Sequence, residues 1–412
     1  MTQIGDDAIL LTPGYTGSLR AMAPRLSILI PTRNRPAMAA VAVRCALDAA
    51  GVDDEVVVAD NGDAPLSLDL DDRRLRVLRA DRVYPMPDNW ERVIRDARGE
   101  SLLLLSDKHR LVPGSVARLL SARERPDDVV TYALATFVQN VPSADVERAS
   151  SLAEAAGTLH YAKGPRHARR RSSRETLADW YRTMRYQLAR PMLYSAIIPR
   201  RIVDDVVRRH GRFLHGVAPD VASSLQILAE TDSYVETDIA GTVIHFPTWD
   251  PRWSSGASMS TGGTLGNGFL REFGSSPLGR LPPLAASAVY QTLLACARLR
   301  PGSAPSESRL LQQFAREAAA EVELSKRADR AAMHRAIFAA TQAAGAHPAS
   351  VLAQLQSVVY AQISPALRQR VRRLIGRQEA SGPATPPRAC ADLKEALDSV
   401  ASENRQAETP TG

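Results

Sequence analysis

Four predominantly apolar runs, separated by segments of helical spacing, constrain the fold of this chain more than any other feature. The runs are LSILI, EVVVAD, LRVLRA and SLLLLSD, at residues 26–30, 55–60, 75–80 and 101–107. Short runs of this kind are typical of strands buried on both faces of a sheet. Residues 36–50 and 89–98, which lie between them, have helical spacing. The alternation predicts an α/β fold with a mostly parallel sheet and helices on its faces.

Polar residues follow three of these strands, at 32–35, 60–63 and 107–109. In sheets of this kind, ligands bind in the crevice beyond the carboxyl ends of the strands. We therefore expect the ligand site of this domain among these three loops.

Changes in composition divide the rest of the chain. They predict a loose leader at 1–23, an α/β domain at 24–250, a Gly-, Ser- and Pro-rich loop or lid at 251–283, a separate all-helical region at 284–375 and a disordered tail at 376–412. Within the α/β domain, residues 193–198 resemble a strand and 233–246 a hairpin, in which Gly241 leaves the position of the turn open. The basic stretch KGPRHARRRSSR, at 163–174, is either a solvated or disordered insertion or a clamp for an anionic substrate.

Charge and cysteine usage set broad limits on function. The net charge of +7 over 412 residues fits an anionic substrate such as a nucleotide diphosphate, and equally a merely soluble surface. Cys45, Cys296 and Cys390 have neither disulfide-framework nor metal-ligand spacing, which predicts a reducing, cytoplasmic location. No segment has the pattern of a signal peptide or of an uncharged membrane span, so we expect no integral membrane segment.

Three motifs in order resemble the inverting glycosyltransferases of family 2. They are SILIPTRNR at 27–35, VVVADNGD at 56–63 and DNWERVIRDARGESLLLLSDKHRLVPGSV at 88–116. The resemblance covers residues 24–250. It implies the GT-A fold, a Rossmann-like and mostly parallel sheet that binds a nucleotide-sugar, and it implies transfer of the sugar with inversion.

The resemblance places the donor nucleotide beside the first two of these loops. Asp60 and Asn61 occupy the acidic turn that contacts the base or ribose in the family, and Thr32 and Arg35 would lie beside the base. A simpler interpretation remains open for each of them. Asp60 and Asn61 also suit an ordinary turn, and Arg35 suits a solvated loop.

The acidic metal motif of the family is altered in this chain. Asp107 takes its first acidic position and His109 its last, and His245 falls where GT-A enzymes place a third ligand. Imidazole is a good ligand for first-row transition ions and a poor one for Mg²⁺, so this set predicts Mn²⁺ in preference to Mg²⁺. The alternative is that Lys108 and Arg110 neutralise the pyrophosphate without a metal.

The segment RFLHGVAPDVASSLQIL, at 212–228, resembles the part of the family that carries the catalytic base. Asp220 would then accept the proton of the acceptor hydroxyl, although Asp at this point also suits a helix N-cap. His215 and Gly216 would line the sugar pocket, and His215 also suits a buried, hydrogen-bonded position. Trp249, Trp253 and residues 254–268 would form a lid.

One further departure concerns the phosphate. Asp88 stands where many family members have an arginine that holds the pyrophosphate. Lys108, Arg110 or the basic stretch are the available substitutes.

Two hypotheses follow from these residues. The first is a metal-assisted glycosyltransferase that uses a nucleotide diphosphate-sugar donor, with Asp220 as base and a small molecule, glycan or lipid-linked acceptor that remains open. The alternative is an inactive GT-A domain that binds nucleotide-sugar or serves as a scaffold. Nucleic-acid binding is not expected, because no basic surface with interleaved aromatic residues is present. The apolar helices of 284–375 are suited to bury against a second subunit or against the sheet.

Overall fold

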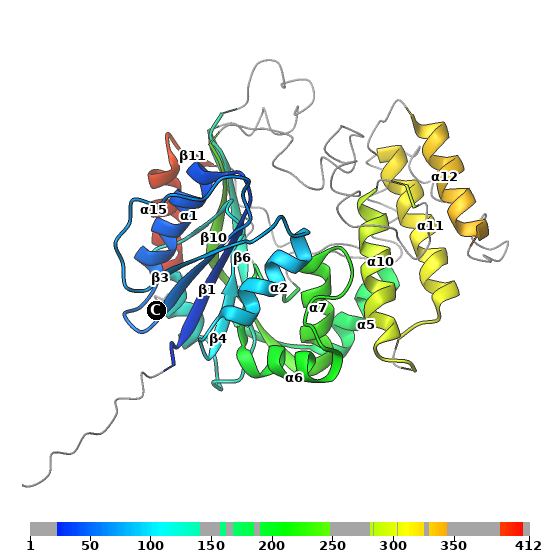
Figure 1. Ribbon diagram of the computed structural model, residues 1–412, viewed down its shortest axis with the longest axis horizontal. Coiled ribbons are helices and arrows are strands. Elements are labelled where there is room, and N and C mark those ends of the chain that lie inside the picture. Colours follow the sequence, from blue (N-terminus) through cyan, green and yellow to red (C-terminus); the bar gives the residue numbers. More distant parts are fainter. Residues whose placement is uncertain are drawn as a thin grey trace, which may run out of the picture.

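A central twisted sheet with helices on both faces forms the body of the computed structural model (Figure 1). The structure describes residues 23–140, 157–161, 168–184, 190–247, 281–282, 284–302, 304–324, 329–343 and 388–406. The strands are β1 (Leu26–Thr32), β2 (Glu55–Asp60), β3 (Leu75–Arg79), β4 (Ser101–Leu104), β5 (His109–Leu111), β6 (Val130–Val138), β7 (Thr158–Tyr161), β8 (Arg169–Ser172), β9 (Ala196–Pro199), β10 (Ser233–Phe246) and β11 (Arg388–Ala389).

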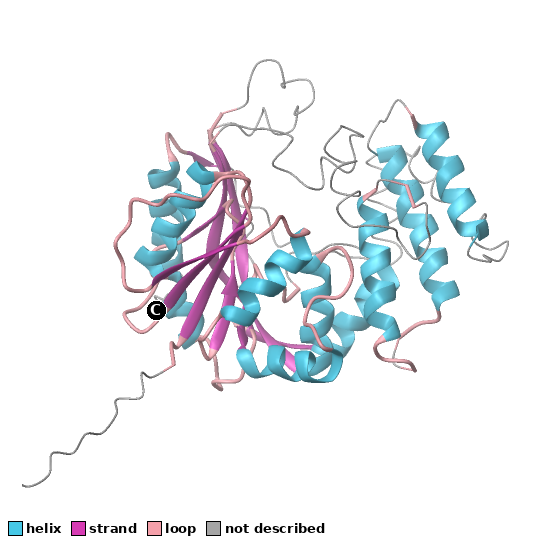
Figure 2. Cartoon of the chain, viewed as in Figure 1, coloured by secondary structure: helices cyan, strands magenta, loops and turns pink. Residues whose placement is uncertain are grey.

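The helices alternate with the strands along the first part of the chain and gather on their own near its end. They are α1 (Pro36–Ala49), α2 (Met86–Asp96), α3 (Ser115–Ser121), α5 (Ser173–Thr183), α6 (Arg200–His210), α7 (Pro219–Glu230), α10 (Ala285–Arg298), α11 (Glu307–Leu324), α12 (Arg330–Ala343) and α15 (Leu393–Gln406). Figure 2 shows that the group formed by α10, α11 and α12 contains helices alone, whereas α15 lies against the sheet.

The strand order is β11-β7-β6-β9-β4-β1-β2-β3, and β10 pairs with β5, β6 and β8 beside this path. β1 lies between β2 and β4 and runs parallel to both, and β3 runs parallel to β2. β9 is antiparallel to β4 and to β6. The predicted α/β fold with a mostly parallel central sheet is confirmed.

Successive side chains of the central strands are buried on opposite faces of the sheet, under different helices. Ile28 and Ile30 pack with Val43 of α1, whereas Leu29 packs with Trp90 and Val93 of α2 on the other face. Because side chains alternate across a strand, a strand without polar alternation is stable only when both faces are covered. The apolar runs of the sequence therefore become the sandwiched centre of the domain.

In the region predicted as helical at 284–375, the described residues form the three helices α10, α11 and α12 with short turns between them. α10 packs against α7 of the sheet domain, and α11 packs between α10 and α12. The rings of Tyr290 and Phe314 stack with their centroids 4.9 Å apart at the α10–α11 interface. These helices bury an apolar face against the sheet domain and against each other, and Phe338 of α12 stays 45% exposed.

The hairpin predicted at 233–246 is wrong, because β10 is one long strand. It pairs in parallel with β6 through two register shifts, at Glu236/Ala240 and Ala240/Thr242. Gly241 makes no turn. It lets the ring of Tyr132 pack against the backbone, since a Cβ at Gly241 would lie 2.5 Å from Cδ2 of that ring.

The disordered tail predicted at 376–412 is wrong over residues 388–406, which form β11 and α15. Ala396, Val400 and Ala401 recur at helical spacing and are buried against the sheet. Asn404 donates from Nδ2 to the carbonyl of Ala240 and accepts from its amide, at 3.0 and 3.1 Å. The helix thus satisfies the backbone at the irregular point of β10, a role that its polar composition did not reveal.

Part of the basic stretch is also ordered. Residues 169–172 form β8, which pairs antiparallel with the start of β10. Arg169 and Arg171 pair with Glu236, and Arg170 pairs with Asp128 at 2.9 Å. Acidic side chains of the same domain thus neutralise these arginines, so this half of the stretch is a structural strand. None of the helices that the structure describes has the length and apolar character needed to cross a membrane.

Gly241 gives a test of the packing of β10. G241A places a Cβ against the rigid ring of Tyr132, and overpacking of this kind costs about 1–3 kcal/mol. We expect the free energy of unfolding to fall by that amount in urea or thermal unfolding. G51A is the control, because the atom nearest to its Cβ is the flexible end of Arg25, at 3.0 Å. Equal destabilisation by both substitutions would contradict the packing assigned to Gly241.

Candidate functional site

The carboxyl ends of β1, β2 and β4 meet at one edge of the sheet. Thr32 pairs with Asp60 in the β1–β2 ladder, and Leu29 pairs with Leu104 in the β1–β4 ladder. Asp107 lies three residues beyond the end of β4, and its Oδ2 accepts a hydrogen bond of 2.9 Å from Oγ1 of Thr32. The parallel pairing therefore brings together two residues that are 75 positions apart in the sequence.

Arg35 covers the Asp107 carboxylate. Its Nε lies 3.1 Å from Oδ2 of Asp107, and the Arg35 side chain is 31% exposed while that of Asp107 is fully buried. Nη1 of Arg110 donates to the main-chain carbonyl of Asp107 at 2.7 Å. Oδ1 of Asp107 is buried and has no protein hydrogen-bond partner. A ligand that approaches this point from solvent meets the guanidinium of Arg35 before it meets the carboxylate.

Lys108 is half-buried in the same cluster. Its ammonium interacts electrostatically with Arg35, Asp107 and Asp220, and lies 5.7 Å from the centre of the Phe246 ring at the end of β10. Burial and the charge of Arg35 lower the pKa of Lys108, and the two carboxylates oppose that change. Two cationic and two anionic side chains thus converge at the predicted edge of the sheet, from the loop after β1, the loop after β4 and the first turn of α7.

Asp220 lies in the first turn of α7, and Ala218 is the N-cap of that helix. Its Oδ1 accepts from the amide of Val221 at 2.9 Å, and its Oδ2 accepts from the Tyr194 hydroxyl at 3.4 Å. Burial raises the pKa of Asp220 above 3.8, although these hydrogen bonds and the charge of Lys108 act against the rise. Asp220 keeps partial solvent exposure, so a carboxylate of raised basicity faces the site.

Asp60 and Asn61 lie at the end of β2, and their side chains form hydrogen bonds to other groups of the protein. Asp60 accepts from the amides of Gly62 and Leu66 and from Arg79, all within 2.9 Å. The side-chain amide of Asn61 donates from Nδ2 to the main-chain carbonyl of Tyr84 and accepts at Oδ1 from the main-chain amide of Tyr84. Burial raises the pKa of Asp60, but these hydrogen bonds outweigh it and lower the pKa overall. Their direct roles in this structure are turn formation and anchoring of the loop before α2.

The loop at 211–218, which leads to Asp220, is held from two sides. The buried carboxylate of Glu91 in α2 accepts from the amides of Phe213 and Leu214, each at 2.9 Å at its shortest. On the other side, Oγ1 of Thr292 in α10 accepts from the amides of Val217 and Ala218, at 3.2 and 3.0 Å.

Gly216 and His215 lie in that loop, and neither bonds to Asp107 or Asp220 in the structure. Gly216 has φ of +89°, and a Cβ there would lie 2.7 Å from Cα of Thr292, so glycine is required on both grounds. Nε2 of His215 bonds to the carbonyl of Arg212 at 2.9 Å, and burial lowers its pKa. Their predicted contact with the donor sugar stays a prediction. The predicted lid, with Trp249, Trp253 and residues 254–268, lies outside the described residues.

Neither the Glu91 nor the Thr292 anchor was predicted from the sequence, since each joins segments at least 74 residues apart. A further unpredicted contact involves Asp88, which stands in place of the family's arginine. Its Oδ1 pairs with Nη2 of Arg212 at 2.8 Å. In this chain the positive charge at this contact is therefore carried by Arg212, and position 88 carries the negative charge.

His109 does not have the geometry of a metal ligand. Its Nδ1 accepts from the amide of Ser106 at 3.1 Å, which leaves the ring proton on the buried Nε2. Metal coordination through Nε2 needs the other tautomer. The ring instead stacks on Tyr194 with centroids 5.3 Å apart, and burial with the charges of Lys108 and Arg110 lowers its pKa to about 3.

His245 lies on the other face of the sheet from His109. His109 pairs with Ile244 in the β5–β10 ladder, so the side chain of the next residue, His245, projects away from it. Its ring stacks on Phe137 at 5.8 Å, and burial lowers its pKa to about 4. Among the described residues, no group of three or more His, Cys, Asp or Glu side chains is arranged to hold a metal. The residues present do not fit the predicted ion as a set.

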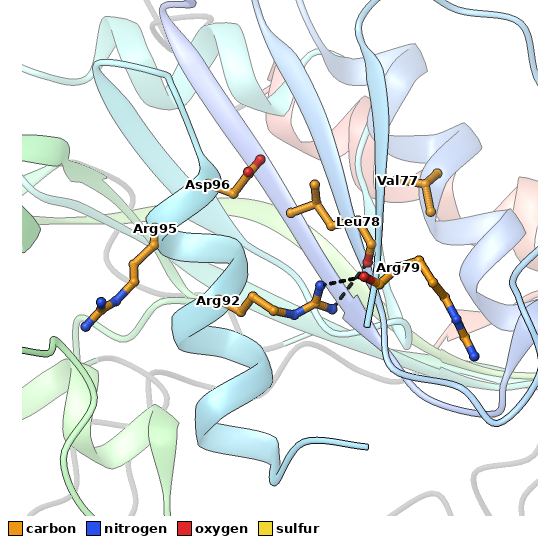
Figure 3. A pocket seen from close by; sticks show the side chains of 6 residues that line it. All are labelled: Val77, Leu78, Arg79, Arg92, Arg95 and Asp96. Atoms are coloured by element: carbon orange, nitrogen blue, oxygen red, sulfur yellow. Dashed lines mark hydrogen bonds between the residues drawn. The ribbon is translucent and has the colours of Figure 1, made fainter. Parts of the chain in front are cut away.

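The clefts beside α2 are separate from this cluster. One, of about 480 Å³, is lined by residues of β3 and α2, where Arg92 reaches the carbonyl oxygens of Leu78 and Arg79 (Figure 3). A second, of about 420 Å³, lies between α2 and the Arg212 loop. The first cleft has three arginines and one carboxylate, and neither cleft includes Asp107 or Asp220. Both clefts are therefore distinct from the cluster of charged side chains around Lys108.

Comparisons with known proteins add little to this geometry. No protein-family model and no curated protein sequence matches the chain. Among solved structures, the crystal structure of S. aureus TarS 1–349 in complex with UDP-GlcNAc matches 85% of this chain and 92% of its own, with 11% identity and a TM-score of 0.45. Likeness at this level supports no argument about activity, so a function for this chain must follow from its own residues.

Thr292 gives a test of the contact between the helical region and the Asp220 loop. T292V keeps the shape but leaves two backbone amides without an acceptor, which costs about 1–3 kcal/mol. We expect the thermal unfolding midpoint to fall in T292V and to stay close to wild type in T292S, which keeps the hydroxyl. If T292V unfolds like wild type, the two amides do not depend on Thr292.

Proposed function

We propose that this chain is a glycosyltransferase that moves a sugar from a nucleotide diphosphate-sugar to an acceptor hydroxyl. One observation carries the proposal. The carboxyl ends of β1 and β4 bring cationic Arg35 and Lys108 to the first turn of α7, where Asp220 is a carboxylate whose pKa is raised. A diphosphate leaving group needs the positive charge, and an attacking hydroxyl needs the base. The motif resemblance to family 2 supports the same assignment.

The reaction that suits this arrangement is a single displacement. The acceptor oxygen attacks the anomeric carbon, its proton passes to a carboxylate oxygen of Asp220, and the bond from that carbon to the phosphate oxygen breaks. The electron pair leaves with the nucleoside diphosphate, and the anomeric carbon inverts. Lys108 and Arg35 stabilise the charge that develops on the leaving oxygen, where a fixed cation lowers the barrier most.

Supporting groups hold the proposed base in place. The hydroxyl of Tyr194 bonds to Asp220, and the Tyr194 ring lies between the rings of His109 and Trp90. Under this proposal His109 has a positioning role, since it stabilises Tyr194 and through it the carboxylate. The acceptor is an alcohol of a small molecule, a glycan or a lipid-linked glycan.

A second candidate function is nucleotide-sugar binding without turnover. The ion pair of Arg35 with Asp107 favours it, because the first acidic residue of the motif is already neutralised. The two candidates differ in turnover and agree in donor binding, so a binding assay and a hydrolysis assay separate them.

Donor binding is tested by a thermal-shift panel of nucleoside diphosphates and their sugar conjugates. We expect one nucleotide to raise the unfolding midpoint, because ligand that binds only the folded state stabilises it by mass action. The matched sugar nucleotide is then used in a hydrolysis and transfer assay. A panel in which no nucleotide stabilises the protein would falsify the proposed function, and binding without hydrolysis or transfer selects the second candidate.

Asp220 gives a sharper test of the mechanism. The base must be ionised, so kcat/KM is expected to fall as the pH drops through the raised pKa of Asp220, above the 3.8 of an ordinary aspartate. D220N is expected to lower kcat by about 10²–10⁴-fold, the usual contribution of a general base, while it leaves donor binding in place. Unchanged turnover in D220N excludes this residue as the base.

Tyr194 supplies the control for that pH profile. Its hydroxyl lowers the pKa of Asp220, so Y194F should move the acid limb to higher pH without abolishing turnover. An acid limb that does not respond to Y194F belongs to another group.

A further inference from the structure

The loop that replaces the acidic metal motif presents positive charge to solvent and keeps its carboxylate beneath. Arg35 is 31% exposed above a fully buried Asp107, and Lys108 is partly exposed beside both of them. In a metal site the carboxylates face the ion directly. Here the first groups that a phosphate meets are an ammonium and a guanidinium.

The charge of these groups matches that of the ion expected from the motif. Lys108 and Arg35 together carry two positive charges, as a divalent cation does. The ion pair with Asp107 engages Nε of Arg35, and a guanidinium has five N–H donors in a planar fork that suits phosphate oxygens. Asp107 therefore fixes the direction of the guanidinium, and Thr32 fixes Asp107.

The side chains predicted as the other ligands have separate structural roles. His109 accepts a backbone N–H and stacks on Tyr194, and His245 stacks on Phe137 on the other face of the sheet. Moving either imidazole onto an ion beside Asp107 would break these contacts.

We propose that Lys108 and Arg35 bind the diphosphate of the donor in place of a divalent cation, so that donor binding is independent of metal. The proposal rests on the proposed function and specifies how its donor is held. Asp107 and Thr32 are positioning residues in this site. The charge of Lys108 also acts on Asp220, whose pKa burial raises and Lys108 lowers.

The test is calorimetric titration of the full chain with the nucleoside diphosphate selected by the thermal-shift panel. Titrations are run in EDTA and in Mn²⁺. We expect equal affinity in the two conditions. K108M and R35Q, titrated in EDTA, should each weaken binding by about ten- to a hundred-fold, the usual effect of removing a charged hydrogen-bond partner.

K394M is the matched control. Lys394 is an exposed lysine of α15, paired with Asp398 away from the site, and its loss should leave affinity unchanged. Thermal unfolding of each variant checks that the variant is folded. The comparison of wild-type affinity in EDTA and in Mn²⁺ tests the proposal even if a variant does not fold.

Two results would overturn the proposal, and only the second would also overturn the proposed function. Binding that requires Mn²⁺ and is unchanged in K108M contradicts the metal-free site and leaves the glycosyltransferase assignment intact. Absence of binding to any nucleoside diphosphate, with or without Mn²⁺, contradicts both.

Discussion

The hydrogen bond from Thr32 to Asp107 is the contact on which the candidate site depends. It exists because β1 runs parallel to β4, which brings the carboxyl ends of two distant strands to the same edge of the sheet. Asp107 is buried there and orients Arg35 toward solvent. Removing the carboxylate would leave Thr32 and Arg35 without a shared partner and would add an unbalanced positive charge next to Lys108. The direction of each cation is thus a consequence of strand pairing.

The same edge is completed from the other half of the chain. Asp220 directly follows a loop whose backbone amides are held by Glu91 of α2 on one side and Thr292 of α10 on the other. The helical region is therefore packed against the segment that carries the proposed base. A change in how α10 lies on this loop would be transmitted directly to Asp220. This contact would couple the helical region to the position of the proposed base.

Most of the central sheet could be predicted from the sequence. The apolar runs that became β1 to β4 each lack polar alternation, and such runs are stable only between two layers of helices. The loops after them gathered as expected, which brought Thr32, Arg35 and Asp107 together. Asp60 and Asn61 lie where they were expected, but their hydrogen bonds are all directed to their own turn and to Tyr84. The observed hydrogen bonds therefore support the simpler interpretation, in which these two residues form an ordinary turn.

Local pattern failed wherever a distant contact decided the outcome. α15 is polar enough to resemble a disordered tail, and it folds because Asn404 and a narrow apolar stripe meet the irregular centre of β10. Gly241 resembles a turn residue, and it lies in a strand because Tyr132 occupies the space of its missing side chain.

The sequence by itself determined the strand–helix alternation, the loops that form the site and the presence of Lys108 in an acidic motif, because these are properties of neighbouring residues. Only the tertiary structure decided which side chains meet. His109 and His245 are separated by the face of a strand, whereas Arg35, Lys108 and Asp220 are brought together by strand pairing and helix packing. Strand direction, register and burial determine the distances between these side chains, and none of the three can be predicted from the spacing of the residues along the chain.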